Sequence, residues 1–284
     1  MIDFHSHILP NIDDGSTSMD ETINLIIEAK QVGFTGIIST SHYIQGYYES
    51  DESKRKQVLV EVEKNYKQIV EGQKKNRPQI AVGQKKNRPQ IAARAKKEPT
   101  PICPNSSLHL GSEIYITTEI IELIKNGKAS TINNTRYVLF ELPMNSKPLF
   151  AKEVVYRLIE NGYKPIIAHP ERYGYVQEEI EYIEELANMG ALFQSNYGSI
   201  VGMYGSRAQK TIKELLKKDL VSFLGSDVHR TNQIYPKIPK ILKKLSKIIS
   251  DQKLKELTTL NAQKVLNDEN IWNAGVHPAF TFLE

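Results

Sequence analysis

The chain has 284 residues, and its 40% hydrophobic and 25% charged content is typical of a globular protein rather than a disordered one. No apolar run approaches the ~20 residues of a membrane helix and no signal-peptide pattern begins the chain, so we expect a cytoplasmic protein without membrane insertion. Nine basic residues and no acidic one lie within residues 72–97. The formal net charge is +4 for the whole chain, and without these nine residues it is −5. The basic character is therefore local and does not indicate nucleic-acid binding.

The chain opens with a short apolar run that predicts a strand over Ile2–His5. Two histidines, His5 and His7, lie at its end, and residues i and i+2 of a strand face the same side. Both imidazoles can therefore reach one metal ion, although a lone His-x-His pattern is weak evidence. Residues 18–21 are typical of a capping box, and they predict a helix that stops at Gly33.

Six further apolar or β-branched runs predict strands, and the amphipathic stretches between them predict helices. The predicted strands are 36–40, 107–111, 136–141, 165–168, 191–195 and 220–225. The predicted helices are 54–71, 152–161, 177–189, 206–218, 237–250 and 252–267. The alternation predicts a parallel sheet, and seven strands favour a closed or nearly closed α/β barrel, with an open doubly wound sheet as the alternative.

A duplicated segment interrupts this alternation. Residues 72–81 and 83–92 both read GQKKNRPQIA, and five prolines lie close by. We therefore expect no regular structure over about 72–105, and we interpret this stretch as a flexible, basic surface insertion in a single domain spanning residues 1–284. The alternative is a basic arm for an acidic partner or a membrane surface. Cys103 lies in this stretch and is the only cysteine of the chain, which excludes an internal disulfide. Its loop-like context does not favour a catalytic nucleophile.

Residue types that bind metal ions follow almost every predicted strand. Beyond the first two histidines they are, in chain order, His42, Glu113, Glu141, His169, Asp227 and His229. The C-terminal strand ends of an α/β barrel converge on one mouth, where active sites lie. Histidines and carboxylates are rarely gathered for packing, and crowded carboxylates need cations between them. One such residue alone would be structural, but the whole set predicts a multinuclear metal site.

Three segments, HSHILPNIDDG, AHPERY and GSDVHR, resemble the motifs of the PHP (polymerase and histidinol phosphatase) superfamily. The sequences of these segments resemble even more closely those of the bacterial manganese-dependent tyrosine-protein phosphatases that capsule and exopolysaccharide gene clusters encode. The resemblance runs from residue 1 to about 267 and is interrupted by the duplicated segment. It implies a distorted (β/α)7 barrel, in agreement with the strand count, and two or three bound ions. Manganese is expected first, with iron or zinc as alternatives.

The resemblance also implies how the donors divide among the ions. The first ion would be held by His5, His7, Glu113 and Asp227, with Glu113 bridging. The second would be held by Glu113, Glu141 and His169. The third would be held by Asp14, His42 and His229. Asp13 is adjacent to Asp14 and either carboxylate can reach, while both are also ordinary turn residues before Gly15.

For the chemistry, we expect a hydroxide bridging two ions to attack phosphorus in line with the leaving oxygen, because metal lowers the pKa of water from ~16 to ~7. An arginine would neutralise the phosphoryl oxygens, and Arg172, which the resemblance supports, is favoured over Arg230. A tyrosine phenolate, with a pKa of ~10, leaves without much help, whereas an alcohol needs a general acid such as His229.

Tyrosines also lie near the predicted mouth, where aromatic residues more often pack than bind a ligand. They are Tyr43, Tyr47, Tyr48, Tyr173 and Tyr175.

The resemblance implies a protein-tyrosine phosphatase that dephosphorylates a tyrosine autokinase controlling capsule or exopolysaccharide synthesis. One alternative is a small-molecule phosphatase similar to histidinol phosphatase. Another is a metal-binding regulatory module without turnover, against which the complete ligand set argues. We expect no nucleic-acid partner, because no strong basic stripe is visible outside the insertion, and the sequence is compatible with a homo-oligomer.

Overall fold

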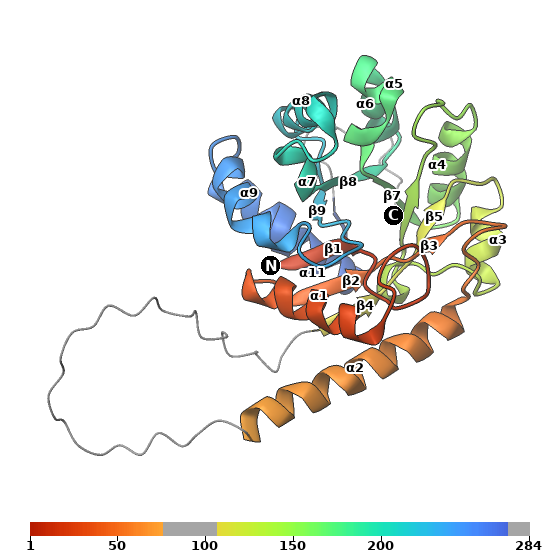
Figure 1. The fold of residues 1–284 in the computed structure, drawn as a ribbon. Helices are drawn as coiled ribbons and strands as arrows, with labels where there is room; N and C mark the ends of the chain where they lie inside the picture. The colour runs from red at the N-terminus through yellow and green to blue at the C-terminus, as the bar shows by residue number, and fades with distance from the viewer. Residues whose placement is uncertain (76–106, 272–284) are drawn as a thin grey trace, which may run out of the picture.

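Parallel strands curve around a central axis with helices on their outer side, so the chain is an α/β protein with a distorted barrel (Figure 1). The structure, a computed structural model, describes residues 1–75 and 107–271. The distorted barrel expected from the sequence is confirmed. The predicted insertion lies outside the described residues from residue 76 onward, as does Cys103. The single-domain reading of the whole chain therefore stays a prediction.

The strands form two sheets, and every pair of neighbours is parallel. In the order β1-β2-β4, the first sheet contains β1 (Ile2–Ser6), β2 (Gly36–Ser39) and β4 (Ser107–Leu110). The second, in the order β3-β5-β6-β7-β8-β9, contains β3 (His42–Tyr43), β5 (Glu113–Tyr115), β6 (Tyr137–Glu141), β7 (Lys164–Ala168), β8 (Leu192–Asn196) and β9 (Phe223–Gly225). All seven predicted strands are present, and β3 and β5 are short additions.

The two additions are continuations of predicted strands past a polar break. β3 follows β2 after Thr40 and Ser41, and β5 follows β4 after Gly111 and Ser112. At the break the backbone N–H of Glu113 lies 3.1 Å from the carbonyl of Thr40 and 3.2 Å from that of Ser41. The small polar residues end the apolar pattern, which is why the sequence did not indicate strands beyond them.

The ring of strands closes where β1 meets the segment after β9. The N–H of Asp227 donates to the carbonyl of His5 at 2.8 Å, and the N–H of His7 donates to the carbonyl of Val228 at 3.0 Å. A parallel bridge between Ser6 and Val228 completes this contact. The first and last motifs of the sequence are thereby joined backbone to backbone.

The main helices are α1 (Met19–Gln31), α2 (Glu52–Lys75), α3 (Ile120–Lys125), α4 (Ala151–Glu160), α5 (Gly174–Glu178), α6 (Glu181–Asn188), α7 (Tyr197–Ile200), α8 (Gly205–Lys217), α9 (Ile238–Leu245), α10 (Asp251–Lys255) and α11 (Asn261–Leu266). Short 3₁₀ turns lie at Ile132–Asn134, Pro170–Arg172 and Tyr235–Lys237, and a π-helical turn lies at Glu256–Leu260.

The start of α1 is only half of the predicted capping box. Ser18 Oγ accepts a hydrogen bond from the N–H of Glu21 at 3.1 Å, as expected. The Glu21 carboxylate, however, accepts from the N–H of Thr17 at 2.9 Å rather than from Ser18. The helix ends before Gly33, whose φ of +101° is a conformation that glycine adopts readily.

Several helix boundaries differ from the predicted ones. α2 continues to Lys75, four residues into the first repeat copy, because buried Val58, Val62, Tyr66 and Val70 keep an i, i+4 pattern. The predicted helix over 177–189 is divided into α5 and α6. α3 and α7 are too short to show helical periodicity in a sequence.

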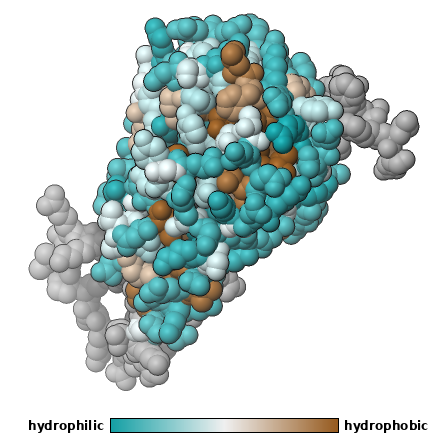
Figure 2. Space-filling model, turned by 90° about the vertical axis from the view of Figure 1, so that its right-hand side faces the viewer, coloured by the Kyte–Doolittle hydropathy of each residue, from teal (hydrophilic) through white to brown (hydrophobic). Residues whose placement is uncertain are grey.

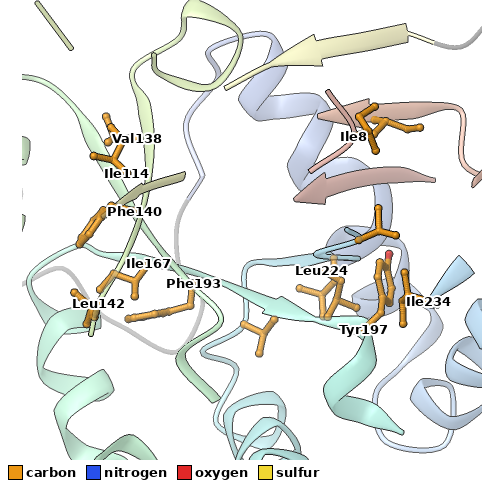
Figure 3. Close-up of a cluster of buried hydrophobic side chains, with 14 of the residues drawn as sticks. Ile8, Ile114, Val138, Phe140, Leu142, Ile167, Phe193, Tyr197, Leu224 and Ile234 are labelled. Carbon is orange, nitrogen blue, oxygen red and sulfur yellow. The ribbon is translucent and has the colours of Figure 1, made fainter. Parts of the chain in front are cut away.

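Apolar side chains pack on both faces of the strands, as expected for a parallel sheet. Outside, Ile114, Phe140, Ile167 and Phe193 are register neighbours across β5 to β8 and pack in the cluster shown in Figure 3. Inside, a second cluster includes Phe4 and Phe223, whose rings stack at 4.0 Å, and it is closed below by Ala262 and Val265 of α11.

The inner face carries the chemistry at the upper end of the strands. Leu139 belongs to the inner cluster, and Glu141 lies two residues further along the same strand. Glu113 is the register partner of Leu139 on the neighbouring strand. Both glutamates are therefore aimed at the mouth by strand geometry alone.

The face drawn in Figure 2 is largely hydrophilic, and its apolar residues gather mainly in the upper half of the view. Among the described residues, no helix has the length and apolar character that crossing a membrane requires.

Candidate metal centre

The structure gathers every predicted donor at the C-terminal end of the strands. They lie in or directly after β1, β3, β5, β6, β7 and β9, with one contribution from the loop between β1 and α1. The set is His5, His7, Asp14, His42, Glu113, Glu141, His169, Asp227 and His229. Apart from Asp14, these side chains are buried or half-buried.

Glu113 is the centre of the cluster. Its Oε2 lies 3.1 Å from His5 Nε2, 3.3 Å from His7 Nε2 and 3.3 Å from His42 Nδ1. Its Oε1 lies 2.8 Å from His169 Nε2. Burial alone would raise the pKa of Glu113, but the facing imidazoles of His5, His42 and His169 hold it well below its usual range. This carboxylate therefore faces four nitrogen donors, which favour its charged form.

The donors form three groups, and within each group the ligand atoms lie within 4.8 Å of one another. The groups are His5, His7 and Asp227; His42, Glu113 and Glu141; and His7, Asp14, His42 and His229. The first group fits the division that the resemblance implies. His42 differs, because its Nδ1 lies 3.3 Å from Glu141 and its Nε2 lies 3.7 Å from Asp14, so the ring stands between two groups. His169 lies beside Glu113 and is 3.9 Å from Glu141.

Asp13 and Asp14 have different environments. Asp13 is buried, and its Oδ2 lies 2.8 Å from His7 Nδ1 and accepts from the N–H of His42 at 2.8 Å. Asp14 is half exposed, and its Oδ1 lies 3.4 Å from His229 Nε2. The structure therefore turns Asp14 toward the donors and uses Asp13 to orient His7.

The donor set fits divalent cations. His5 Nε2 and His7 Nε2 lie only 3.0 Å apart, while Nδ1 of each ring already faces an oxygen of Gln194 or Asp13. With their protons on Nδ1, both rings direct a lone pair at the same point, an arrangement that a shared cation stabilises. Buried Glu113 Oε2 and His42 Nδ1 also have no hydrogen-bond partner among the described residues. Mixed imidazole and carboxylate donors suit manganese, iron or zinc.

The second carboxylate of the cluster shows the same need for positive charge. Burial and the neighbouring Glu113 carboxylate raise the pKa of Glu141 to about 9. Two carboxylates so close together repel unless a cation lies between them. A divalent ion is the simplest species that would keep both of them ionised.

A supporting layer, absent from the sequence-based site, comes from β8. Gln194 Oε1 lies 2.8 Å from His5 Nδ1, and Gln194 Nε2 donates to Asn196 Oδ1 at 2.9 Å. Asn196 Nδ2 in turn donates to Asp227 Oδ2 at 2.7 Å. The two amides are spaced i and i+2 on the inner face, as are His5 and His7. That spacing was the available signal, but amides are weaker indicators of metal sites than histidines.

We expect Gln194→Leu to weaken the binding of a divalent ion by about 10- to 100-fold, because it removes the acceptor that fixes the His5 ring. Titration calorimetry with Mn²⁺ would measure this, with Gln57→Leu on the exposed face of α2 as the matched control. Unchanged affinity in the Gln194 variant would show that the His5 ring needs no such support.

The backbone is strained at two donor positions. His169 and Asp227 have φ values of +32° and +52°, which cost non-glycine residues roughly 1–3 kcal/mol each. The turn before Asp227 is held by buried Asp3, which accepts from the N–H of Ser226 at 2.7 Å and from the Tyr235 hydroxyl at 2.8 Å. Burial, opposed by these hydrogen bonds, raises the pKa of Asp3 to about 6. Sequence reasoning missed Asp3 because it reads as part of the apolar strand.

The two candidate arginines have different surroundings. Arg172 Nη1 donates to Asp227 Oδ2 at 2.7 Å, its guanidinium lies 4.5 Å from the Tyr204 ring centre, and its side chain is 26% exposed. Arg230 Nη1 instead donates to backbone carbonyls of Asp14, Gly15 and His229. Arg172 thus reaches the donor cluster and remains accessible, whereas Arg230 holds the loop that carries Asp14.

Most tyrosines near the mouth pack, as expected. Tyr43 and Tyr173 are buried, and the Tyr173 hydroxyl donates to the Ala168 carbonyl at 2.7 Å. Tyr48 stacks on His42 with ring centres 6.1 Å apart, and the neighbouring Tyr47 is 83% exposed. Tyr175 is half-buried and stacks on Tyr173 with ring centres 5.7 Å apart, so Tyr47 and Tyr48 are the tyrosines of this set that lie open at the rim.

Comparison with known proteins gives a consistent result. The CpsB/CapC family, described as capsular polysaccharide synthesis, matches residues 1–75 and 71–267. The putative tyrosine-protein phosphatase CapC of Staphylococcus aureus is 33% identical over 278 residues, covering 95% of this chain and 93% of that protein. The tyrosine-protein phosphatase YwqE of Bacillus subtilis is 27% identical, covering 98% of this chain and 96% of that protein.

Solved structures give the same picture. The TM-score is 0.79 for a solved structure whose description names YwqE from Bacillus subtilis and CpsB from Streptococcus pneumoniae as unique metal-dependent tyrosine phosphatases. It is 25% identical and covers 99% of this chain and 100% of that chain. A phosphotriesterase homology protein from Escherichia coli, with a TM-score of 0.52 and 11% identity over 92% of this chain and 97% of that one, is similar in fold alone.

Proposed function

The chain belongs to the CpsB/CapC family of capsular polysaccharide synthesis, and from that premise we propose that it is a metal-dependent protein-tyrosine phosphatase. The family is the one that the sequence motifs resemble. The observation that carries the proposal is the meeting of three donor groups around Glu113, at the mouth of the barrel. Full-length relatives named as tyrosine-protein phosphatases, together with the metal-dependent relative of similar fold, support the same reaction.

In this proposal the nine predicted donors hold two or three divalent ions, with manganese first. Such ions supply Lewis acidity and a nucleophile near neutral pH, because they lower the pKa of water from ~16 to ~7. The side chains of the protein bind the phosphoryl group and orient the metal ligands. Arg172, held by Asp227 and Tyr204, binds the nonbridging phosphoryl oxygens. The rings of His5 and His7 are fixed by Gln194 and Asp13, so both would present their Nε2 atoms to the ions in a fixed orientation.

The leaving group sets how much acid catalysis is needed. A phenolate with a pKa of ~10 departs readily, so a tyrosine ester needs little help from a proton donor. His229 Nδ1 lies 3.0 Å from the Asp227 carbonyl, and its Nε2 faces Asp14 at the partly exposed rim. We assign His229 with Asp14 to the third ion, and a proton-donating role only for esters of alcohols.

The substrate is a phosphotyrosyl protein. The relatives' names support that class, and a bacterial tyrosine autokinase acting in capsule or exopolysaccharide synthesis is the partner that the resemblance implies. A cytoplasmic location, expected from the sequence, belongs to the same proposal.

Tyr204 is a positioning residue for Arg172. We expect Tyr204→Leu to lower kcat/KM for a phosphotyrosyl peptide by about 2- to 30-fold, because a cation–π contact contributes roughly 0.5–2 kcal/mol. Tyr204→Phe keeps the ring and should stay close to the wild type. In an Arg172→Ala background, Tyr204→Leu should add nothing further. A full additional loss there would show that Tyr204 acts independently of Arg172.

The proposed function is tested by comparing substrates after loading the protein with Mn²⁺, Fe²⁺ or Zn²⁺ in separate samples. We expect the highest kcat/KM for a phosphotyrosyl peptide and a much lower value for histidinol phosphate. The opposite order would favour the small-molecule phosphatase. Protein that binds the metal but hydrolyses no phosphomonoester would instead be a regulatory module.

A further inference from the structure

We propose that the exposed lysine rows of α8 and α9 form a docking face for an acidic segment of the phosphotyrosyl substrate. This proposal rests on the proposed function and adds the chemistry that selects the substrate. The residues of this α8–α9 basic face are Lys210, Lys213, Lys217, Lys240, Lys243 and Lys247.

The sequence concentrates positive charge here a second time. Residues 205–264 contain fourteen basic and five acidic residues. On α8 the exposed lysines are spaced i, i+3 and i+7 (Lys210, Lys213 and Lys217), and the lysines at 240, 243 and 247 repeat that spacing along α9 and the residues after it. Residues with this spacing lie on one side of a helix. The stripe escaped the sequence analysis because it is divided between two helices.

The other edge of α8 is neutralised, which sets the basic face apart. Arg207 pairs with Glu178 at 3.6 Å, and Lys218 pairs with Glu184 at 2.7 Å, both on the side of α5 and α6. α6 itself carries Glu181, Glu184 and Glu185. Among the described residues, none of the six lysines of the basic face has an ion-pair partner at its ammonium group. Glu214, half-buried on α8, is the acidic residue closest to the row in sequence.

The face begins at the mouth of the barrel. Outer helices of a parallel barrel start near the C-terminal strand ends, and α8 starts at Gly205, directly after Tyr204, which contacts Arg172. On the other side, Lys237 Nζ, just before α9, lies 3.6 Å from Met203 Sδ. Both helices contact α7, which lies between them on the outer side of the strands in Figure 1. A chain whose phosphotyrosine enters the mouth can therefore continue along the two rows.

The reach of such a chain can be stated. Lys210 and Lys217 are seven residues apart, or about 10 Å along a helix at 1.5 Å per residue. An extended peptide advances about 3.3 Å per residue, so three or four residues cover that row and a few more lead to it from the mouth. We therefore place the recognised acidic residues about four to ten positions from the phosphotyrosine.

A polypeptide fits this face better than a lipid surface does. The exposed positions of α8 and α9 carry lysine, arginine, serine and proline, and large apolar side chains that would enter a bilayer are absent from them. The direct connection to the mouth also favours a segment of the substrate itself. Several phosphotyrosines in one tail would supply the same negative charge as aspartate or glutamate.

The test compares two phosphotyrosyl peptides that differ only in their flanks, glutamate in one and glutamine in the other. The variant is Lys210→Glu/Lys213→Glu/Lys240→Glu, and the matched control is Lys64→Glu/Lys67→Glu/Lys125→Glu on exposed positions of α2 and α3. At low salt we expect the wild type and the control to prefer the glutamate peptide by about tenfold in kcat/KM, because a complementary field raises association rates. The variant should lose this preference, and so should the wild type in 0.5 M salt.

Hydrolysis of p-nitrophenyl phosphate separates the two proposals. It should be unchanged within about twofold in the variant, which also shows that the variant is folded and loaded with metal. A peptide with lysine flanks should become a better substrate for the variant than for the wild type. If the triple variant kept the preference for the glutamate peptide, or if the wild type had no such preference, the proposal of a docking face would be wrong. The proposed phosphatase activity would not be affected by either result. Loss of binding to phosphatidylglycerol vesicles with unchanged peptide selectivity would assign the face to a membrane instead.

Discussion

Glu113→Ala should abolish hydrolysis of a phosphotyrosyl peptide, with a fall of at least about a thousandfold in kcat/KM. The expected size follows from the loss of metal-activated water, whose pKa would return from ~7 toward ~16. Glu113 is fully buried and faces His5, His7, His42 and His169. Removing it would deprive the proposed ions of a shared oxygen donor and would leave several imidazoles facing one another.

Metal content should fall together with activity. Elemental analysis of the purified variant should give at most one equivalent, against two or three for the wild type. Glu122→Ala, an exposed carboxylate on α3, is the matched control and should behave as the wild type. A Glu113 variant that keeps both its ions and its turnover would remove Glu113 from the centre of the site.

Arg172→Ala should lower kcat/KM for the phosphotyrosyl peptide by about 10²- to 10³-fold, the usual cost of losing one donor that stabilises transition-state charge. Arg172 lies over the Tyr204 ring and donates to Asp227, so its guanidinium is held beside the donors. Arg172→Lys should recover only part of the loss, because an ammonium group neither stacks nor binds two oxygens at once. Steady-state kinetics with inorganic phosphate as a competitive inhibitor would measure both effects.

This variant separates phosphate binding from metal binding. Metal content should remain at the wild-type value, since Arg172 contributes no donor atom. Arg157→Ala on α4 is the matched control, because that guanidinium donates to the carbonyl of Thr118 on the surface. If Arg172→Ala lost its ions in parallel with its activity, the residue would be supporting Asp227 rather than binding the phosphoryl group.

The strands and the mouth could be predicted because six of the seven predicted strands combine two signals. An apolar run such as 136–141 indicates a buried strand, and a polar residue at its end, such as Glu141, indicates chemistry at the C-terminal edge. The parallel barrel then converts six distant positions into neighbours. No side-chain detail is needed for this step, since strand direction and the inner face fix where Glu113 and Glu141 point.

The roles of adjacent or chemically similar residues could not be assigned from the sequence alone. Asp13 and Asp14 are chemically alike, and only the turn at Gly15 decides that Asp13 holds His7 while Asp14 faces His229. Arg172 and Arg230 each follow a donor motif, yet backbone carbonyls engage Arg230.

The supporting layer and the basic face depend on long-range packing. Gln194 contacts His5 across 189 positions of the chain, so no local pattern connects them. The lysine rows of α8 and α9 are brought near one another only because both helices pack against α7. Signals of this kind lie between elements and not within one, which is why periodicity and spacing do not disclose them.

The central claim, that distant donors share cations at one mouth, is tested most directly by anomalous diffraction from crystals grown with Mn²⁺. The account predicts two or three manganese peaks, one within about 2.0–2.4 Å of a Glu113 carboxylate oxygen and of the His5 and His7 Nε2 atoms. Crystals of active protein without a manganese peak in reach of Glu113 would contradict it.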